Sequence, residues 1–220
     1  MSHILNIETS TTNCSVSLSF ENDLVDYIEQ DSLNYSHSEN LHVFIKELLN
    51  KNNTEFNHLN AISVSRGPGS YTGLRIGLSA AKGLCYGLDI PLISISSLKI
   101  LANSIKCDGF IVSTMDARRD EVYSCIYDSN LNIIREEKPE IINHESFIDI
   151  SKNNKLLFIG DGQFKCKELI NTNHNFSFES SILRPTSKNM IDLAFDKLKN
   201  SDFEDLAYFE PKYLKEFRTN

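Results

Sequence analysis

The chain has 220 residues, of which 40% are hydrophobic and 24% are charged, and its formal net charge is −8 at pH 7. This composition is ordinarily globular, and the length suits one large domain or two small ones. The acidic balance argues against unaided binding of nucleic acid, because neutralising phosphates requires a basic face.

The same reading excludes several other classes of protein. No apolar run approaches the ~20 residues that a membrane span needs, and the N-terminus lacks the pattern of a signal peptide. The sequence has 5 cysteines, an odd number, with no C-x-x-C pair, so neither a disulfide framework nor a zinc site is indicated. We therefore expect a cytoplasmic protein without a membrane partner.

The first elements along the chain are predicted strands. Residues 4–8 and 14–20 read as two strands joined by the polar hairpin "TSTTN", and residues 24–30 read as a third. A helix is predicted from Ser36, because Ser36 and Glu39 form a capping box in front of an apolar-periodic segment. Its apolar stripe, at positions i, i+3, i+4, i+7 and i+8, consists of Leu41, Phe44, Ile45, Leu48 and Leu49.

Strands and helices then alternate in two rounds. The first round continues with a strand at 61–65, a glycine loop, a helix to about residue 87, a strand at 90–95 and a helix at 97–104. The second round consists of a hairpin of 110–118 and 121–128, strands at 131–138 and 156–162, and an amphipathic helix at 187–200. This pattern predicts an α/β protein with two similar halves, residues 1–105 and 106–220.

The stretch "SVSRGPGSYTGLRIGLSAAKGL" has the strand, glycine turn and helix layout of a phosphate-binding loop. It lacks the second glycine and the lysine of a Walker A loop, and no acidic residue ends the next strand as a dinucleotide site requires. An anion site at the helix start, aided by Arg66 or Arg75, stays open as an alternative.

The helix that follows this loop is rich in small residues. Gly73, Gly77 and Ala81 stack on one face, and Ala80, Gly83 and Gly87 line an adjoining face. Each interior glycine costs roughly 1 kcal/mol of helix stability against alanine, so a compensating reason is needed. Close packing on both faces supplies one, either against the chain's own sheet and a second helix or entirely within the chain.

Several segments of the sequence closely resemble the bacterial TsaB (YeaZ) family. They are "RGPGSYTGLRIG", "ILNIETSTTNCSVSL", "SHSENLHVFIKELL", "GLDIPLISISSLKILA" and "MDARRDEVY". The match covers most of residues 1 to 127, and it is only general beyond residue 130. The resemblance implies an actin-like ATPase fold built from two ribonuclease-H-like halves. It also implies a role in making N6-threonylcarbamoyladenosine, which lies beside the anticodon of tRNAs that read codons beginning with A.

The resemblance further implies partners and a docking face. The catalytic relative is TsaD, TsaE is an ATPase partner, and tRNA is reached only through the complex. We expect the helices at 37–51 and 73–87 to bind TsaD, or to close a symmetric homodimer when TsaD is absent. The residues predicted for this face are Leu41, Phe44, Ile45, Leu48, Tyr71, Gly73, Leu74, Gly77, Leu78 and Ala81.

Departures from a working actin-like ATPase indicate a chain without catalytic residues, cofactor or metal. The first hairpin, residues 8–12, lacks the glycine that lets phosphates approach the backbone. A second phosphate loop would fall at residues 116–119, and these residues also lack a glycine. Only Gly160-Asp161-Gly162 represents the adenosine-side glycine cluster. Ile95 and Lys99 occupy the places of the metal-binding histidines of TsaD. The alternative from another class is a small-molecule kinase or a peptidase of the same fold.

Other candidate side chains carry weaker signals. His37 and His42 lie about 140° apart on an ideal helix, which suits a cap neighbour and a surface residue better than a metal pair. Asp116 and Glu121 are the best candidates for acid/base work, although a solvated turn explains both.

Overall fold

The computed structural model describes residues 2–32 and 37–215. The chain divides into two compact units. Unit 1 comprises Met1–Ile100 and Pro185–Lys212, and unit 2 comprises Leu101–Arg184 and Tyr213–Asn220.

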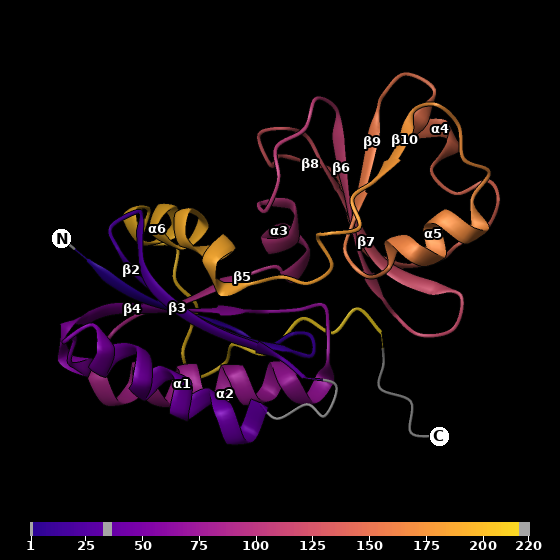
Figure 1. Ribbon diagram of the computed structural model, residues 1–220. Helices are drawn as coiled ribbons and strands as arrows, with labels where there is room; N and C mark the ends of the chain where they lie inside the picture. The colour runs from indigo at the N-terminus through magenta and orange to yellow at the C-terminus, as the bar shows by residue number, and fades with distance from the viewer. Residues whose placement is uncertain (1, 33–36, 216–220) are drawn as a thin grey trace. The chain divides into compact units, whose positions relative to one another are not determined.

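Unit 1 is a five-stranded mixed sheet with helices on both faces (Figure 1). Its elements are β1 (His3–Glu8), β2 (Asn13–Phe20), β3 (Asp23–Asp31), α1 (His37–Lys51), η1 (Phe56–His58), β4 (Leu59–Ser65), α2 (Tyr71–Leu88), β5 (Leu92–Ile95), the start of α3 (Ser97–Ala102), η2 (Ser187–Met190) and α6 (Ile191–Lys199). The predicted strands of this unit are present, with ends that agree to within two residues. The capping box at Ser36 lies outside the described residues.

The strand order in this sheet is β3-β2-β1-β4-β5, with β1 antiparallel to β2 and parallel to β4. The central strand β1 is buried on both faces, because Leu5 and Ile7 point to one side and Ile4 to the other. On the first side, α1 and α2 pack against the sheet, and on the second side α6 does. Figure 1 shows α1 and α2 on one side of the strands and α6 on the other.

The structure corrects the predicted division at one place. Residues 185–212 were expected in the C-terminal half, but Pro185–Lys212 belongs to unit 1. The physical reason is burial, because Met190 and Ala194 are fully buried against Ile4 and Ile93 on the second face of the sheet. Without this segment, that apolar face would be open to water.

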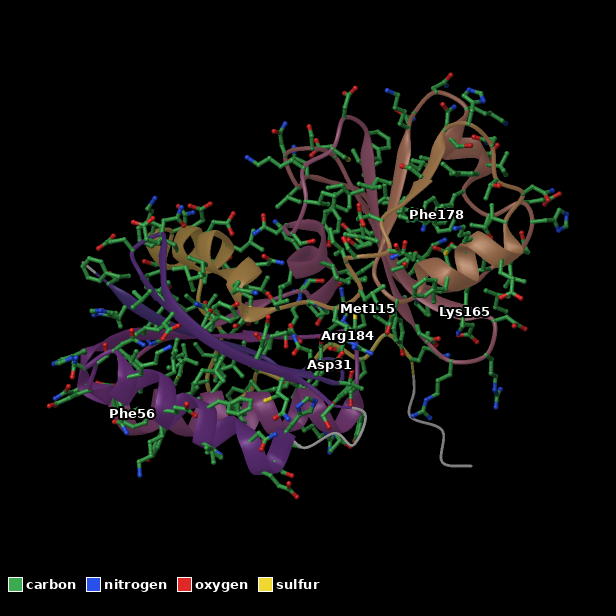
Figure 2. The ribbon with its side chains drawn as sticks, in the orientation of Figure 1. Asp31, Phe56, Met115, Lys165, Phe178 and Arg184 are labelled. Atoms are coloured by element: carbon green, nitrogen blue, oxygen red, sulfur yellow. The ribbon has the colours of Figure 1, made fainter. Side chains whose placement is uncertain are left out.

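Unit 2 repeats the same sheet with fewer and shorter helices. Its elements are β6 (Phe110–Asp116), β7 (Glu121–Tyr127), β8 (Ile133–Ile141), α4 (Ile148–Ser151), β9 (Leu156–Ile159), α5 (Gln163–Leu169) and β10 (Phe176–Phe178). The strand order is β10-β9-β6-β7-β8, and an aromatic cluster around Phe158 fills the core, with Phe178 stacked at 4.9 Å between ring centroids (Figure 2). The elements α4, α5 and β10 were not predicted, because segments of 4, 7 and 3 residues are too short to show a period.

Candidate functional site

The first hairpin, between β1 and β2, lies buried beneath the glycine loop. Glu8, Thr9 and Ser10 are at most 1% exposed. The Ser10 backbone N–H donates to Glu8 Oε1 at 2.6 Å, and the Thr9 N–H donates to Ser65 Oγ at 3.4 Å. Burial raises the pKa of Glu8 to about 7, against the opposing effect of hydrogen bonds from Ser10 and Ser65. The turn is therefore closed by its own side chains and by β4.

The glycine loop and the start of α2 are held directly on this hairpin. Ser70 caps α2 by accepting a hydrogen bond from Gly73 N, and its own N–H donates to Ser10 O at 2.6 Å. Thr9 Oγ1 donates to Gly73 O at 2.8 Å. A Cβ at Gly69 or Gly73 would lie 2.2 Å from a backbone oxygen of the hairpin. These glycines therefore exist for the close approach of the first hairpin to α2.

This contact supplies a reason within the chain for the first glycine stripe, which is one of the two alternatives left open by the sequence. A Cβ at Gly77 would lie 2.2 Å from Thr9 Oγ1, so the close neighbour of Gly73 and Gly77 is a loop of the same chain. By contrast, nothing lies within 4 Å of a Cβ built at Gly83 or Gly87. The second stripe is therefore open at Gly83 and Gly87, whereas Ala80 is buried in the core of unit 1.

Most side chains predicted for the docking face are part of the chain's own core, which is a second correction. They bury their apolar surface against β1, β2 and β4, because an isolated sheet face needs a helix layer to cover it. Phe44 and Tyr71 are half-buried, and the others are buried: Leu41, Ile45, Leu48, Gly73, Leu74, Gly77, Leu78 and Ala81.

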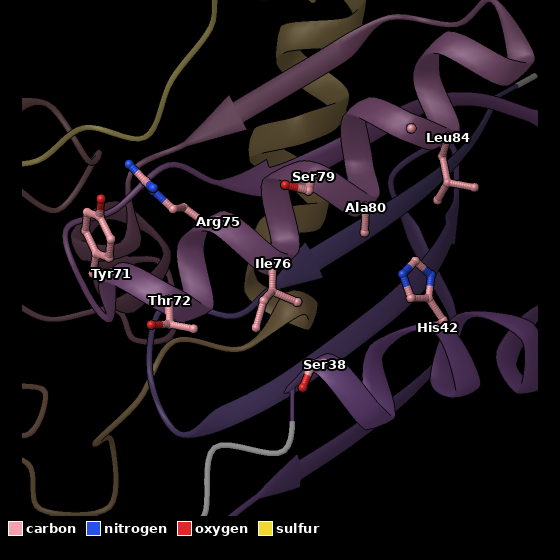
Figure 3. Close-up of a pocket in the computed structure, with 10 residues that line it drawn as sticks. Ser38, His42, Tyr71, Thr72, Arg75, Ile76, Ser79, Ala80 and Leu84 are labelled. Atoms are coloured by element: carbon pink, nitrogen blue, oxygen red, sulfur yellow. The ribbon is translucent and has the colours of Figure 1, made fainter.

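A groove runs between α1 and α2 on their outer side, and its volume is about 600 Å³. We call it the α1–α2 groove; it is lined by Ser38, His42, Tyr71, Thr72, Arg75, Ile76, Ser79, Ala80, Gly83 and Leu84. Figure 3 shows Ile76 and Leu84 of α2 pointing toward α1, and His42 of α1 pointing toward α2. At one end, the Arg75 guanidinium lies 4.1 Å from the centroid of the Tyr71 ring.

The sequence also contains a signal for this groove, which the predicted docking face does not use. Thr72, Arg75 and Ser79 recur at helical spacing, and all three are exposed. Polar residues at that spacing mark the outer face of an amphipathic helix. The apolar stripe at Leu74, Leu78 and Ala81 therefore had to face inward.

The two histidines do not form a metal site. His37 is buried, and its Nε2 lies 2.7 Å from Thr11 O, while burial lowers its pKa. His42 is exposed in the α1–α2 groove. Within residues 2–32 and 37–215, no three His, Cys, Asp or Glu side chains come together in a way that could hold a metal ion. Ile95 is a core residue of unit 1.

The hairpin between β6 and β7 in unit 2 holds the other acidic candidates. Asp116 pairs with Lys165 of α5 at 2.8 Å, and Glu121 pairs with Lys215 at 2.5 Å. Asp161 accepts the Asp116 N–H at 2.8 Å, and burial raises its pKa. Asp116 and Glu121 are thus engaged in ion pairs at a turn, which was not predicted from the sequence.

The strand order shared by the two units defines the class of the protein. A three-stranded meander followed by two parallel strands, β3-β2-β1-β4-β5 and again β8-β7-β6-β9-β10, is the actin-like, ribonuclease-H-like arrangement. The solved structure of YeaZ from Pseudomonas aeruginosa has the same fold, with a TM-score of 0.83 and 25% identity over 97% of this chain and 100% of that one. None of the described helices is long and apolar enough to cross a membrane.

Sequence comparison then places the chain in a family. The family model for TsaD, tRNA N6-adenosine threonylcarbamoyltransferase, matches residues 32–219. The TsaB protein of Escherichia coli K12 is 29% identical over 96% of this chain and 94% of its own length. The TsaB protein of Buchnera aphidicola from Acyrthosiphon pisum is 30% identical over 90% of this chain and 91% of its own. The chain belongs to this family and, within it, to the TsaB (YeaZ) group.

Proposed function

We propose that the chain is a non-catalytic, cytoplasmic subunit that binds TsaD and supports the formation of N6-threonylcarbamoyladenosine in tRNA. Its relatives are named tRNA threonylcarbamoyladenosine biosynthesis proteins, and the matching family model describes the transferase itself. TsaE joins as the ATPase, tRNA is reached only through the complex, and the isolated chain forms a homodimer through the same surface.

The engaged backbone of the first hairpin supports a non-catalytic role. An actin-like ATPase needs free N–H groups at this turn to bind phosphate. Here the N–H groups of Thr9 and Ser10 donate to Ser65 and Glu8, and the glycine loop covers the turn. A phosphate group would have to break these bonds and displace the loop. This observation disfavours the kinase alternative.

The α1–α2 groove is the observation that carries the docking proposal. Gly83 and Gly87 leave open space above α2, and Ile76 and Leu84 supply apolar contact area. A helix of the partner laid along this groove can approach the α2 backbone closely, as small residues allow. The chain then contributes two helices to a four-helix contact with TsaD. The buried stripe at Leu41, Leu74 and Ala81 holds these two helices in position from below.

The docking proposal is tested by filling the open space. Gly83→Leu adds bulk where a partner backbone would lie, and we expect it to abolish binding to TsaD and homodimer formation without unfolding the chain. Asp196→Leu, on the exposed side of α6 across the sheet, is the matched control and should bind normally. Size-exclusion chromatography with light scattering measures assembly, and circular dichroism checks folding. Normal assembly by Gly83→Leu would place the docking face elsewhere.

The functional proposal is tested in cells. A strain that lacks this chain but retains TsaD should contain tRNA without threonylcarbamoyladenosine, because the partner is left unsupported. Mass spectrometry of tRNA hydrolysates measures the modified base, and a plasmid copy of the wild-type chain should restore it. A plasmid copy carrying Gly83→Leu should not. Unchanged levels of the base in the deletion strain would refute the role.

A further inference from the structure

Glu8 is a buried carboxyl group that the docking proposal does not use. It ends β1, is 0% exposed, and Oε1 accepts the Ser10 N–H at 2.6 Å. Its Oε2 is buried and has no hydrogen-bond partner within the described part of the chain. An ionised carboxylate in this place is poorly compensated, because a buried charge needs a counter-charge or a full set of hydrogen bonds.

The hairpin that Glu8 closes is also the support for the start of α2. Ser10 O accepts the Ser70 N–H at 2.6 Å, and Ser70 is the N-cap of α2. Thr9 Oγ1 binds Gly73 O in the first turn of the helix. Residues Tyr71, Thr72 and Arg75 of that same turn and the next line the α1–α2 groove. A continuous set of hydrogen bonds therefore leads from the carboxyl group to the groove.

Burial and hydrogen bonds, rather than a neighbouring charge, set the pKa of Glu8. On β2, Cys14 is a thiol whose pKa is raised to about 11 by burial and by Glu8. On α1, His37 binds Thr11 O, and burial lowers its pKa. At the end of β4, Ser65 Oγ accepts the Thr9 N–H, and Ser65 lowers the pKa of Glu8. The groups that favour the ionised form of Glu8 are the hydrogen-bond donors of Ser10 and Ser65.

We propose that loss of the proton from Glu8 loosens the hairpin from the start of α2 and thereby weakens docking at the α1–α2 groove. This regulation rests on the proposed function, because the groove must be the docking face. The proton leaves to solvent, and an ionised carboxylate draws water into the turn. The direction follows from burial, which raises the pKa of Glu8 to about 7 from its usual 4.5. The hairpin is therefore held most firmly below the usual pKa, and this stabilisation is lost as pH rises from there through about 7.

The test compares three forms of the chain at pH 6 and pH 8.5. Glu8→Gln keeps an acceptor oxygen for the Ser10 N–H but cannot ionise, and Glu136→Gln, on an exposed residue of β8, is the matched control. We expect wild type and Glu136→Gln to bind TsaD about five-fold or more weakly at pH 8.5 than at pH 6, a usual size for coupling between sites. Glu8→Gln should bind TsaD with the same affinity at both pH values.

Hydrogen exchange on the isolated chain separates this regulation from the docking proposal. After correction for intrinsic exchange rates, amides in the first turn of α2 should lose protection at pH 8.5 in wild type and keep it in Glu8→Gln. Unchanged protection and affinity between the two pH values, or a Glu8→Gln profile equal to that of wild type, would overturn the regulation. If no complex with TsaD forms at either pH, the proposed function fails, and the role of Glu8 is then decided by amide protection in the first turn of α2 alone. If Glu8→Gln does not fold, the profile of wild type decides it.

Discussion

Gly73 and Gly83 lie on the same helix, and their surroundings differ in a way that the sequence does not show. A Cβ at Gly73 would lie 2.2 Å from the backbone oxygen of Thr9, whereas a Cβ at Gly83 would meet nothing within 4 Å. The first glycine is required by a contact inside the chain. The second costs helix stability without any contact in the chain to compensate it, as expected of a residue kept for a partner.

Paired alanine substitutions measure this difference. Gly73→Ala should lower the free energy of unfolding by about 1–3 kcal/mol, because a backbone oxygen cannot move aside as a side chain can. Gly83→Ala should raise it by up to about 1 kcal/mol through better helix propensity. Urea unfolding followed by circular dichroism gives both values. Equal effects of the two substitutions would contradict the distinction between a buried and an open face.

At the scale of elements, the C-terminal end of α2 carries an acidic residue where the helix carbonyls already place partial negative charge. Asp89 follows the helix in the left-handed conformation, with φ 54° and ψ 46°, and its N–H donates to Cys85 O. The last turn of α2 contains no basic residue. An acidic side chain at this end interacts unfavourably with the partial negative charge of the helix carbonyls.

Two substitutions separate the charge of Asp89 from its backbone strain. Asp89→Asn should stabilise the chain by about 0.3–1 kcal/mol by removing the charge, and raised salt should shrink this gain. Asp89→Gly should stabilise it by a similar amount that persists at high salt, because glycine adopts the left-handed conformation without strain. Urea midpoints at low and high salt provide the comparison. A gain in stability for Asp89→Asn that is the same at low and high salt would refute the electrostatic explanation.

The elements also show how far the sequence alone could go. Strands such as β1 and β4 were predictable because short runs of branched residues lie between clear turns. The glycines of the loop predicted that another backbone comes close to the start of α2. They did not show that this backbone is the first hairpin, since no local pattern links Thr9 to Gly73. The burial of most residues predicted for the docking face was unpredictable for a related reason. A helix stripe shows which residues are apolar, and only the packed sheet shows that Leu41 and Leu78 are used internally.

At the scale of the whole chain, unit 1 is completed by a segment distant in sequence. Met190 is fully buried against Ile4 and Ile93, and the backbone of residues 204 and 212 bonds to Leu92 O and Arg66 O. The predicted division put this segment in the other half, because the helix pattern at 187–200 says nothing about which sheet the helix covers.

A core substitution in that segment tests its assignment. Met190→Ala should lower the stability of unit 1 by about 2–5 kcal/mol, because it leaves a cavity against the sheet. Ile133→Ala on β8 of unit 2, where the side chain is 50% exposed, is the control and should change little. Hydrogen exchange read by unit should show faster opening of β1 and β5 in Met190→Ala and unchanged opening of β6 and β7. Faster exchange in unit 2 alone would assign the segment to unit 2.

The return of Pro185–Lys212 to unit 1 has a consequence for how the protein is made. A ribosome releases Leu101–Arg184, the main part of unit 2, before it has synthesised the helix that closes the second face of unit 1. Domains commonly fold in order of synthesis, N-terminal first. Here one face of the sheet of unit 1 stays uncovered until Pro185–Lys212 has been translated. The main part of unit 2 is therefore translated before unit 1 can close its second face, so the two units cannot fold strictly in the order of their synthesis.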